Sequence, residues 1–549
     1  MLRSQKSAAR GLPALLAAAA ILTGAACSRP KARPAYTHVI LFIGDGMSVE
    51  SEVAASRYLY GKDRALAWHA FPGTSYVATW DVTAYDSNAR KENRAAYSDS
   101  AFAPSLGYDV GREGVRPYPD EGSLWAGASL AKPATDSASA ATALATGAKT
   151  ISGNIAWRPG DQPWGGLPTI AEEFRGRRGG AIGVITTVPF SHATPAAFVS
   201  HNTSRNHYYT GYKGYEGLGI ADEIILRVKP DVVIGGGNPM FDNPTFDTKK
   251  GYISEGLYKT LKSSTEYVFA ERQAGAEGAR TLLEAAERAR AQGKKLFGLY
   301  GGSDGSFVLP VPEDRPGSPR LTRESAEDLT LKDATLAALR VLGRNPNGFF
   351  LMAEQGDIDW ANHDNNFSGL IATMSDLEEA VRAAVAFVDE PGDDIDWTNT
   401  VLLVTADHAT GGMRLNPSKP LGAGELPRQL ARAKEDEAAQ DQTNGNGRHP
   451  VPPRPAASAF KPPYIYSGGE VSYSTIGHTN ELVTLAVSGR AAPLFLKYAG
   501  TWYPGPIIDN TQINAAMREA LGLGNGKMSL VLNGGAPASP SPSPGAARK

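Results

Sequence analysis

Six short apolar runs, each followed by glycine or acidic residues, organise the chain between residues 38 and 408. They are HVILFIGDG (38–46), GAIGVITT (180–187), DVVIGGG (231–237), LFGLYGG (296–302), GFFLMAEQGDID (348–359) and TVLLVTADH (400–408). Aliphatic runs without polar alternation are typical of strands buried on both faces of a parallel sheet. Helical patterns such as 281–294 and 329–344 lie between them. The alternation predicts an α/β fold with a central, mostly parallel sheet flanked by helices on both faces, and ligand binding at the carboxyl ends of the strands.

One further helix is predicted in TDSASAATALATGAK (135–149), because Ala favours helix and Gly147 followed by a basic residue is a usual stop signal. Asp136 and Ser137 would then stand at its first turn. Backbone N–H groups and the positive end of the helix dipole would favour a serine alkoxide or an attached phosphate there. Taken alone, the stretch is better explained as an ordinary capped helix packed through alanines.

The chain of 549 residues carries 55 Lys and Arg against 57 Asp and Glu, a formal net charge of −2. This balance argues against a nucleic-acid partner held by bulk electrostatics. Residues 1–27 have the form of a secretory signal, followed by a linker (28–35), so we expect an exported protein, periplasmic or secreted. The only cysteine, Cys27, stands at the expected cleavage point in a context that resembles a lipoprotein box, but Gly24 replaces the usual Leu; a lipid anchor there stays open. A single cysteine excludes an intrachain disulfide.

The mature chain is interpreted as one large domain (36–530) with surface insertions at about 85–128 and 414–470, which are rich in turn-forming or polar residues. A Pro/Ser/Ala-rich tail (531–549) is expected to stay disordered.

Metal-type ligands follow three of the predicted strands. The first strand delivers Asp45, the strand at 348–359 delivers Glu354, Asp359 and His363, and the strand at 400–408 delivers Asp407 and His408. Asp359 and His363 are four residues apart, so on a helical turn they face the same way. Carboxylate with imidazole suits zinc, whereas oxygen ligands alone suit magnesium. Each motif alone has an ordinary explanation as a cap, a turn or a solvated helix face, but their coincidence predicts a metal site.

Six motifs in order resemble the alkaline phosphatase family over residues 38 to about 485. They are FIGDGM, TDSA, HATPAAFVSHNTSR, AEQGDIDWANH, VTADHATGG and IGHTNELV. The resemblance implies an exported phosphomonoesterase that releases inorganic phosphate and an alcohol from small phosphorylated substrates. It also implies two Zn²⁺ ions, a third ion of the magnesium type whose identity stays open, and a homodimer as the default assembly.

Site roles follow from the resemblance position by position. Ser137 would be the nucleophile that is transiently phosphorylated, and Arg205 would grip phosphate oxygens. One zinc would be held by Asp359, His363 and His478; the second, beside the Ser137 oxygen, by Asp45, Asp407 and His408; and the third ion by Asp45, Thr194 and Glu354. The physical logic agrees, since a bound zinc and a helix N-terminus both favour an alkoxide, and two cations with an arginine can neutralise a transferring phosphoryl group.

Two positions depart from other family members. His192 stands where some bacterial members place Asp beside the magnesium, and an imidazole weakens an oxygen-rich site. Trp360 stands where others place Lys or His near the phosphate, so weaker phosphate binding and readier product release are expected.

Three other functions compete with this one. Sulfatases need a modified Cys or Ser in a C/S-x-P-x-R motif, which is absent around Ser137, and related phosphodiesterases usually use Thr and lack the arginine. Ser137 and Arg205 therefore favour monoesters, with diesters as a side activity. A non-catalytic metal-binding or phosphate-binding lipoprotein would need no nucleophile.

Overall fold

The computed structural model describes residues 36–107, 134–209, 218–240, 246, 251–302, 305–323, 325–392, 394–428, 464–500 and 507–524. The expected signal with Cys27, the linker and the C-terminal tail lie outside these residues. Among the described helices, none combines the length and apolar character that crossing a membrane requires.

A ten-stranded sheet forms the centre of the domain, in the order β17-β2-β16-β10-β1-β9-β3-β4-β6-β5. Only β16 runs antiparallel to its neighbours, which confirms the mostly parallel prediction. The strands are β1 (His38–Gly44), β2 (Gly73–Ala78), β3 (Ala181–Pro189), β4 (Val232–Gly236), β5 (Tyr267–Glu271), β6 (Lys295–Leu299), β9 (Phe349–Gln355), β10 (Thr400–Thr405), β16 (Val483–Val487) and β17 (Ile507–Asp509).

All six predicted strands are present, as β1, β3, β4, β6, β9 and β10. The sequence did not reveal β2, β5, β16 and β17, which lie toward the two ends of the sheet. β2 mixes buried and exposed positions and β5 is only half-buried, so neither shows the continuous apolar run of a central strand.

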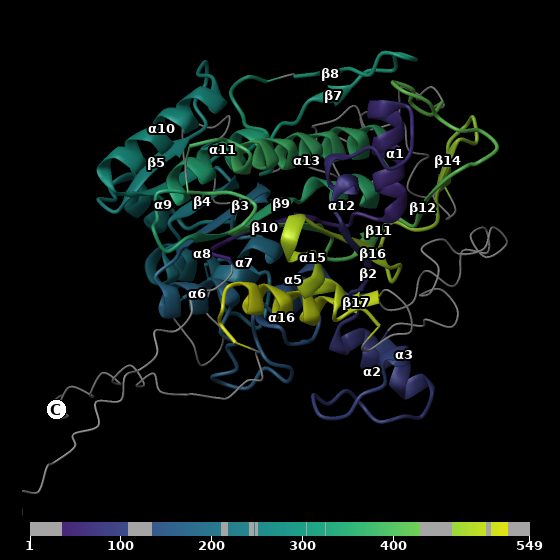
Figure 1. Cartoon of the computed structure of the whole chain (residues 1–549), viewed down its shortest axis with the longest axis horizontal. Coiled ribbons are helices and arrows are strands. Elements are labelled where there is room, and N and C mark those ends of the chain that lie inside the picture. Colours follow the sequence, from purple (N-terminus) through teal and green to yellow (C-terminus); the bar gives the residue numbers. More distant parts are fainter. Residues whose placement is uncertain are drawn as a thin grey trace, which may run out of the picture. The chain divides into compact units, whose positions relative to one another are not determined.

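Helices cover both faces of the sheet (Figure 1). One layer holds α1 (Val49–Tyr60), α10 (Gly278–Gln292), α11 (Leu331–Leu342) and α13 (Phe367–Val388); the other holds α5 (Ser137–Thr146), α6 (Ile170–Arg178), α7 (Ala193–Val199) and α16 (Asn510–Ala520). Shorter helices are α2 (Val82–Lys91), α3 (Pro104–Gly107), α8 (Ile220–Asp222), α9 (Glu255–Lys262), α12 (Asp357–His363) and α15 (Ala492–Leu496). The predicted helices appear as α5, α10 and α11.

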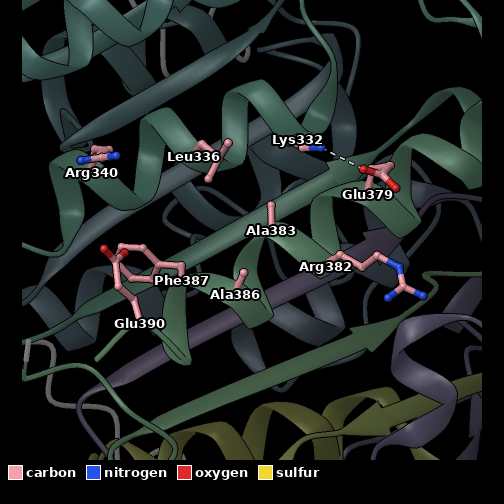
Figure 2. A pocket seen from close by; sticks show the side chains of 9 residues that line it. All are labelled: Lys332, Leu336, Arg340, Glu379, Arg382, Ala383, Ala386, Phe387 and Glu390. Atoms are coloured by element: carbon pink, nitrogen blue, oxygen red, sulfur yellow. Dashed lines mark hydrogen bonds and ion pairs between the residues drawn. The ribbon is translucent and has the colours of Figure 1, made fainter. Parts of the chain in front are cut away.

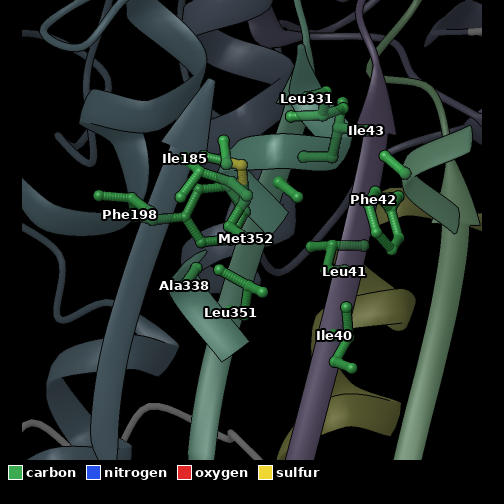
Figure 3. Packing of buried hydrophobic residues seen from close by; sticks show 14 of the residues in the cluster. Ile40, Leu41, Phe42, Ile43, Ile185, Phe198, Leu331, Ala338, Leu351 and Met352 are labelled. Carbon is green, nitrogen blue, oxygen red and sulfur yellow. The ribbon is translucent and has the colours of Figure 1, made fainter. Parts of the chain in front are cut away.

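The core lies on both sides of the central strands. Figure 3 shows Ile40 and Phe42 of β1 with Met352 of β9, packed among side chains from the flanking helices. Phe198 of α7 stacks on Phe350 of β9 with 5.9 Å between the ring centroids. This two-sided burial explains why these strands are apolar throughout and why their polar residues stand only at the ends.

The described parts of the two expected insertions carry structure of their own. Between residues 80 and 107, Trp80, Tyr85, Tyr97 and Phe102 form a small aromatic cluster next to α2 and α3. The second region contributes to a three-stranded sheet of β12 (Met413–Leu415), β13 (Tyr464–Ile465) and β14 (Val471–Tyr473). Residues 108–133 and 429–463 lie outside the described chain.

Candidate active site

Four adjacent strands in the middle of the sheet deliver the predicted site residues at one edge. β10, β1, β9 and β3 are consecutive neighbours and all parallel. Asp45 follows β1, Glu354 lies near the end of β9 with Asp359 and His363 on the helix after it, Asp407 and His408 follow β10, and His192 and Thr194 follow β3. The carboxyl ends of parallel strands meet at one edge, so the sheet itself brings distant motifs together.

Ser137 stands at the first position of α5, as predicted, and is 2% exposed. Asp136 caps the helix by accepting a hydrogen bond from the backbone N–H of Ser139, and Gly147 ends it in the left-handed conformation (φ 76°). The Oγ atom of Ser137 lies 3.1 Å from Nε2 of His408 and 3.5 Å from Oδ1 of Asp45. The helix therefore presents the serine hydroxyl to the residues at the strand ends.

Asp45, Asp407 and His408 form the first ligand group next to the serine. Nε2 of His408 lies 3.3 Å from both Oδ1 of Asp45 and Oδ2 of Asp407, and all three side chains are buried. The backbone N–H of Gly46 donates to Oδ1 of Asp407 at 3.2 Å, which fixes the orientation of that carboxylate. The turn after β10 allows Asp407 and His408, adjacent in sequence, to converge on one point.

The predicted trio of Asp359, His363 and His478 forms the second group; the ligand atoms of Asp359 and His478 also lie within 4.8 Å of one on His408. Nε2 of His363 lies 3.2 Å from Oδ2 of Asp359 and 3.2 Å from Nε2 of His478. The Nδ1–H of His478 donates to the carbonyl oxygen of Thr135 at 2.8 Å, which leaves its Nε2 facing the group. The His408 ring stacks on the His478 ring at 3.8 Å, so the two groups are contiguous.

The residues expected around a third ion are also neighbours. Thr194 donates to Oδ2 of Asp45 at 3.4 Å, and Thr186 donates to Oε2 of Glu354. His192 lies edge-on to Trp360, with 5.9 Å between ring centroids. Burial, with Arg205 adding to it, lowers the pKa of His192 to about 3, so this imidazole is neutral.

The two carboxylates of the first group, and Glu354 beside them, resist ionisation. Burial, followed by repulsion from Asp359, raises the pKa of Asp407 to about 8. Burial also raises the pKa of Glu354 to about 7. The pKa of Asp45 is raised well above its usual value by burial and by the charges of Asp407, Asp359 and Glu354. Three buried acids thus share one place, and Arg205 is the cation that lowers the pKa of Asp45.

In the second group, the charged forms of Asp359 and His363 are favoured. Burial favours neutral forms, but Asp359 outweighs it and raises the pKa of His363 to about 9. Burial would raise the pKa of Asp359, yet His363 and His478 hold it well below its usual value. Burial lowers the pKa of both His408 and His478, which leaves their ring nitrogens available as neutral donors to a metal.

These residues fit divalent cations. Oδ2 of Asp407 and Oε1 of Glu354 are buried and accept no hydrogen bond from the described residues. The two groups supply carboxylate oxygens and imidazole nitrogens, the donor set that suits zinc, while the surroundings of Glu354 and Thr194 are richer in oxygen. A bound cation would satisfy the orphaned oxygens and permit Asp45 and Asp407 to ionise together.

Arg205 lies next to the nucleophile helix. Its guanidinium donates to Oδ2 of Asp136 at 3.1 Å, and its backbone N–H donates to the carbonyl of Gly153 at 2.8 Å. The Arg205 side chain is 22% exposed, so it remains accessible from outside the site. The structure thus brings Arg205 and Ser137 together through Asp136, the residue between them.

Two supporting residues were not identified from the sequence. Thr410 donates to Oδ1 of Asp359 at 2.6 Å and lies 3.3 Å from Nδ1 of His408, so it touches both ligand groups. Its position two residues after His408 was the available signal, because alternate residues of a strand share a face. Thr135 acts through its backbone carbonyl on His478, which no side-chain pattern can reveal.

The pocket in Figure 2 is a separate feature of the outer helix layer. It lies between α11 and α13, has a volume of about 390 Å³, and is crossed by an ion pair of 2.9 Å between Lys332 and Glu379. None of the predicted site residues lines it, so it contributes nothing to the strand-end site.

The fold and site define an α/β protein with two contiguous candidate metal-ligand groups around a serine at a helix N-terminus. The family model described as alkaline phosphatase matches residues 123–523. The chain belongs to the alkaline phosphatase family, which confirms the resemblance seen in its motifs.

Its relatives carry the same family name. Alkaline phosphatase 3 of Bacillus subtilis (strain 168) is 30% identical over 377 residues, covering 68% of this chain and 61% of that protein. Alkaline phosphatase of Escherichia coli (strain K12) is 31% identical over 306 residues, covering 52% of this chain and 59% of that protein. The chain therefore spans 61% and 59% of the length of these two relatives.

Solved structures show the same fold. The alkaline phosphatase of Thermus thermophilus has a TM-score of 0.55 with 21% sequence identity, and the two chains are covered to 90% and 92%. A cold-active alkaline phosphatase from Shewanella sp. has a TM-score of 0.53 with 22% identity, covering 88% of this chain and 99% of that one.

Proposed function

We propose that this chain hydrolyses phosphate monoesters to inorganic phosphate and an alcohol through a phosphoserine at Ser137. The observation that carries this proposal is the position of the Ser137 Oγ atom, at a helix N-terminus and 3.1 Å from a residue of the first ligand group. The names of the relatives point to the same activity.

In the first step, Ser137 Oγ loses its proton and attacks phosphorus while the ester P–O bond breaks and the departing alcohol oxygen gains a proton. In the second step, water attacks the phosphoserine, the serine Oγ takes back a proton and inorganic phosphate leaves. Arg205 binds two phosphate oxygens through its planar guanidinium, and the first turn of α5 stabilises the negative charge near Ser137.

Asp359, His363 and His478 would hold one divalent cation, and Asp45, Asp407 and His408 a second. We assign Zn²⁺ to both because of their mixed oxygen and nitrogen donors. Bound there, the ions lower the pKa of a coordinated hydroxyl or water and offset the charge of the transferring phosphoryl group. Asp45, Thr194 and Glu354 would hold the third ion; a mutant of the TAB5 alkaline phosphatase, with 18% identity and a TM-score of 0.51, has Mg bound in its M3 site.

Export to the periplasm or outside the cell, an anchor at Cys27 and assembly as a homodimer are further proposals. The first two rest on the signal-like residues 1–27 and the third on the family. Fractionation of cells producing the full chain, and light scattering of the purified protein, test them directly.

The nucleophile is tested by Ser137→Ala, with Ser263→Ala at an exposed helix end as the matched control. We expect Ser137→Ala to lower turnover of a chromogenic phosphate monoester by about 10³-fold or more while its bound metal stays at the wild-type level, because the ligand groups are untouched. Wild-type turnover in the Ser137→Ala protein would refute the phosphoserine. Absence of turnover in fully metallated wild type would refute the monoesterase itself.

A further inference from the structure

Asp81 is a buried carboxylate outside the two ligand groups that contacts the nucleophile helix α5 through Ser139. It caps α2, is 1% exposed, and belongs to neither ligand group. Its Oδ1 accepts from the backbone N–H of Ala84 at 2.7 Å, and its Oδ2 accepts from the hydroxyls of Ser152 at 2.8 Å and Ser139 at 2.9 Å. One carboxylate oxygen is therefore fixed on α2 while the other faces α5.

Ser139 connects Asp81 to Asp136. Its Oγ lies 2.9 Å from Oδ2 of Asp81 and 2.7 Å from Oδ1 of Asp136. A hydroxyl has one proton and can donate fully to only one of the two carboxylates. The Thr135 hydroxyl lies 2.9 Å from the Ser139 oxygen and can donate a hydrogen bond to it. This bond does not give Ser139 a second proton with which to donate to the other acid. Asp81 and Asp136 consequently compete for the Ser139 proton.

Asp136 is the carboxylate that holds Arg205. It accepts from the backbone N–H groups of Ser139 at 3.0 Å and Gly153 at 3.1 Å, and its Oδ2 receives the Arg205 guanidinium. Burial raises the pKa of Asp81 to about 6. Burial opposes ionisation of Asp136 too, but Arg205 and the hydrogen bonds hold its pKa below the usual value. The competition follows from the geometry, because one hydroxyl lies within hydrogen-bond distance of both carboxylates.

We propose that Asp81 is a positioning residue which, through Ser139, sets how firmly Asp136 holds Arg205 and hence how tightly the site binds phosphate. The inference rests on the proposed function, because it takes Arg205 as the phosphate-binding group. When Asp81 draws the Ser139 proton, Asp136 has one donor fewer and depends more on the guanidinium. When Ser139 donates to Asp136, the guanidinium is released toward the ligand.

The variant Asp81→Asn has a defined geometry. The amide oxygen must take the Oδ1 position to accept from Ala84, so the amide nitrogen faces Ser139 and donates to its Oγ. The Ser139 proton then goes to Asp136 without competition. We expect the inhibition constant for inorganic phosphate at pH 8 to fall by about fivefold, with a smaller change in kcat. Ser139→Ala removes the connecting hydroxyl and should raise that constant by about threefold.

A double-mutant cycle separates this path from other effects. In a Ser139→Ala background, Asp81→Asn should change the phosphate inhibition constant by less than about twofold, since the connection no longer exists. Asp86→Asn, on the same helix but away from α5, is the matched control and should leave the constant unchanged.

The outcomes decide the inference. The inference is supported if Asp81→Asn lowers the phosphate inhibition constant, Ser139→Ala raises it, and Asp81→Asn has no effect in the double variant. General damage to the fold would instead weaken phosphate binding in both single variants. An equal Asp81→Asn effect in both backgrounds, or none in the wild type, overturns it. The same assay shows whether the wild type hydrolyses the monoester at all, so a failure of the proposed function is seen separately.

Discussion

Two buried clusters of ionisable groups in the same domain differ in whether their charges are balanced. The first, here called the acid cluster, consists of Asp45, Glu354 and Asp407 at the strand ends. The second, here called the His201 cluster, consists of His201 with Glu172 and Glu223. Both are largely buried apart from Glu172, whose side chain is 29% exposed. An unpaired charge in such a buried place costs several kcal/mol.

The charged groups of the His201 cluster are paired within the protein. Nδ1 of His201 lies 2.9 Å from Oε1 of Glu223, and its Nε2 lies 3.4 Å from Oε2 of Glu172 and 2.9 Å from the carbonyl of Leu167. Burial would lower the pKa of His201, but the two carboxylates raise it well above its usual value. Burial would raise the pKa of Glu172, yet His201 lowers it to about 2. The guanidinium of Arg227 also donates to Oε1 of Glu223 at 3.2 Å, so the two carboxylates face two cations.

The charges of the acid cluster are not balanced by groups within it. Burial, followed by repulsion from Asp359, raises the pKa of Asp407 to about 8, and burial raises the pKa of Glu354 to about 7. Burial also lowers the pKa of the neighbouring His408. The acids therefore lack the protonated imidazole that balances the other cluster. The contrast teaches that a buried imbalance of charge marks a place for a cation, whereas a buried balanced pair marks a structural contact.

The largest expected effect on the comparison between the two clusters is that of the variant Asp407→Asn. We expect turnover to fall by about 10³-fold or more, because an amide is a poorer metal ligand than a carboxylate. Without metal, however, the variant should unfold at a higher temperature than wild type at pH 9. The raised pKa of Asp407 means that its contribution to stability is present at acidic pH and is lost as the pH rises through about 8.

Thermal unfolding of chelated protein between pH 5 and 9 measures that difference. The advantage of Asp407→Asn should grow with pH and be small at pH 5, with the exposed Asp63→Asn showing no such trend. A variant less stable than wild type at pH 9 would contradict the claim that the acid cluster is unbalanced.

The next largest effect is expected for His201→Gln in the balanced cluster. The variant removes the buried cation from both carboxylates and leaves Glu223 with the exposed Arg227 and Glu172 with hydrogen bonds from Thr169. This loss should cost about 2 kcal/mol of unfolding free energy near pH 6. Because the pKa of His201 is raised on folding, this contribution is complete below the unfolded value of about 6.5 and is lost as the pH rises through the folded value. The cost should therefore shrink toward alkaline pH.

Urea unfolding at several pH values checks this expectation, with turnover measured on the same samples. Turnover within about tenfold of wild type is expected, in contrast to Asp407→Asn. A cost of the variant that is independent of pH, or a loss of turnover as large as that of Asp407→Asn, would abolish the distinction between the two clusters.

The smallest effect is expected at Trp360, which faces the neutral His192 at the edge of the acid cluster. Trp360→Lys adds a cation near the proposed phosphate site and should lower the inhibition constant for inorganic phosphate by about tenfold. Trp360→Leu, which removes the ring without adding charge, is its control. If Lys and Leu shift the constant alike, the ring rather than the missing charge sets the affinity.

The sequence was enough to predict those strands and ligands whose local residue pattern matches their environment in the folded protein. Strands such as β1 and β10 are apolar because both faces are covered, and Asp45, Asp407 and His408 stand where those strands end. Family membership could be predicted from the order of such motifs, and the match over residues 123–523 confirms it. The assigned roles of individual ligands remain predictions.

Other features depend on contacts that no local pattern contains. β16 is antiparallel and lies between β10 and β2, a position fixed only by the completed sheet. No motif in the sequence points to Asp81, and its link to Asp136 runs through the hydroxyl of Ser139 on α5. The different pKa values of the two buried clusters likewise follow from burial and distance, not from residue type.

The central claim is that the acid cluster exists to hold catalytic cations. Its most direct test is hydrolysis of a chromogenic phosphate monoester at alkaline pH by the purified protein, before chelation, after chelation, and after zinc and then magnesium are restored. The account predicts turnover that is abolished by chelation, is recovered with zinc, and shows in its further response to magnesium how the site beside His192 is used. Full turnover in protein shown to be free of metal would contradict it.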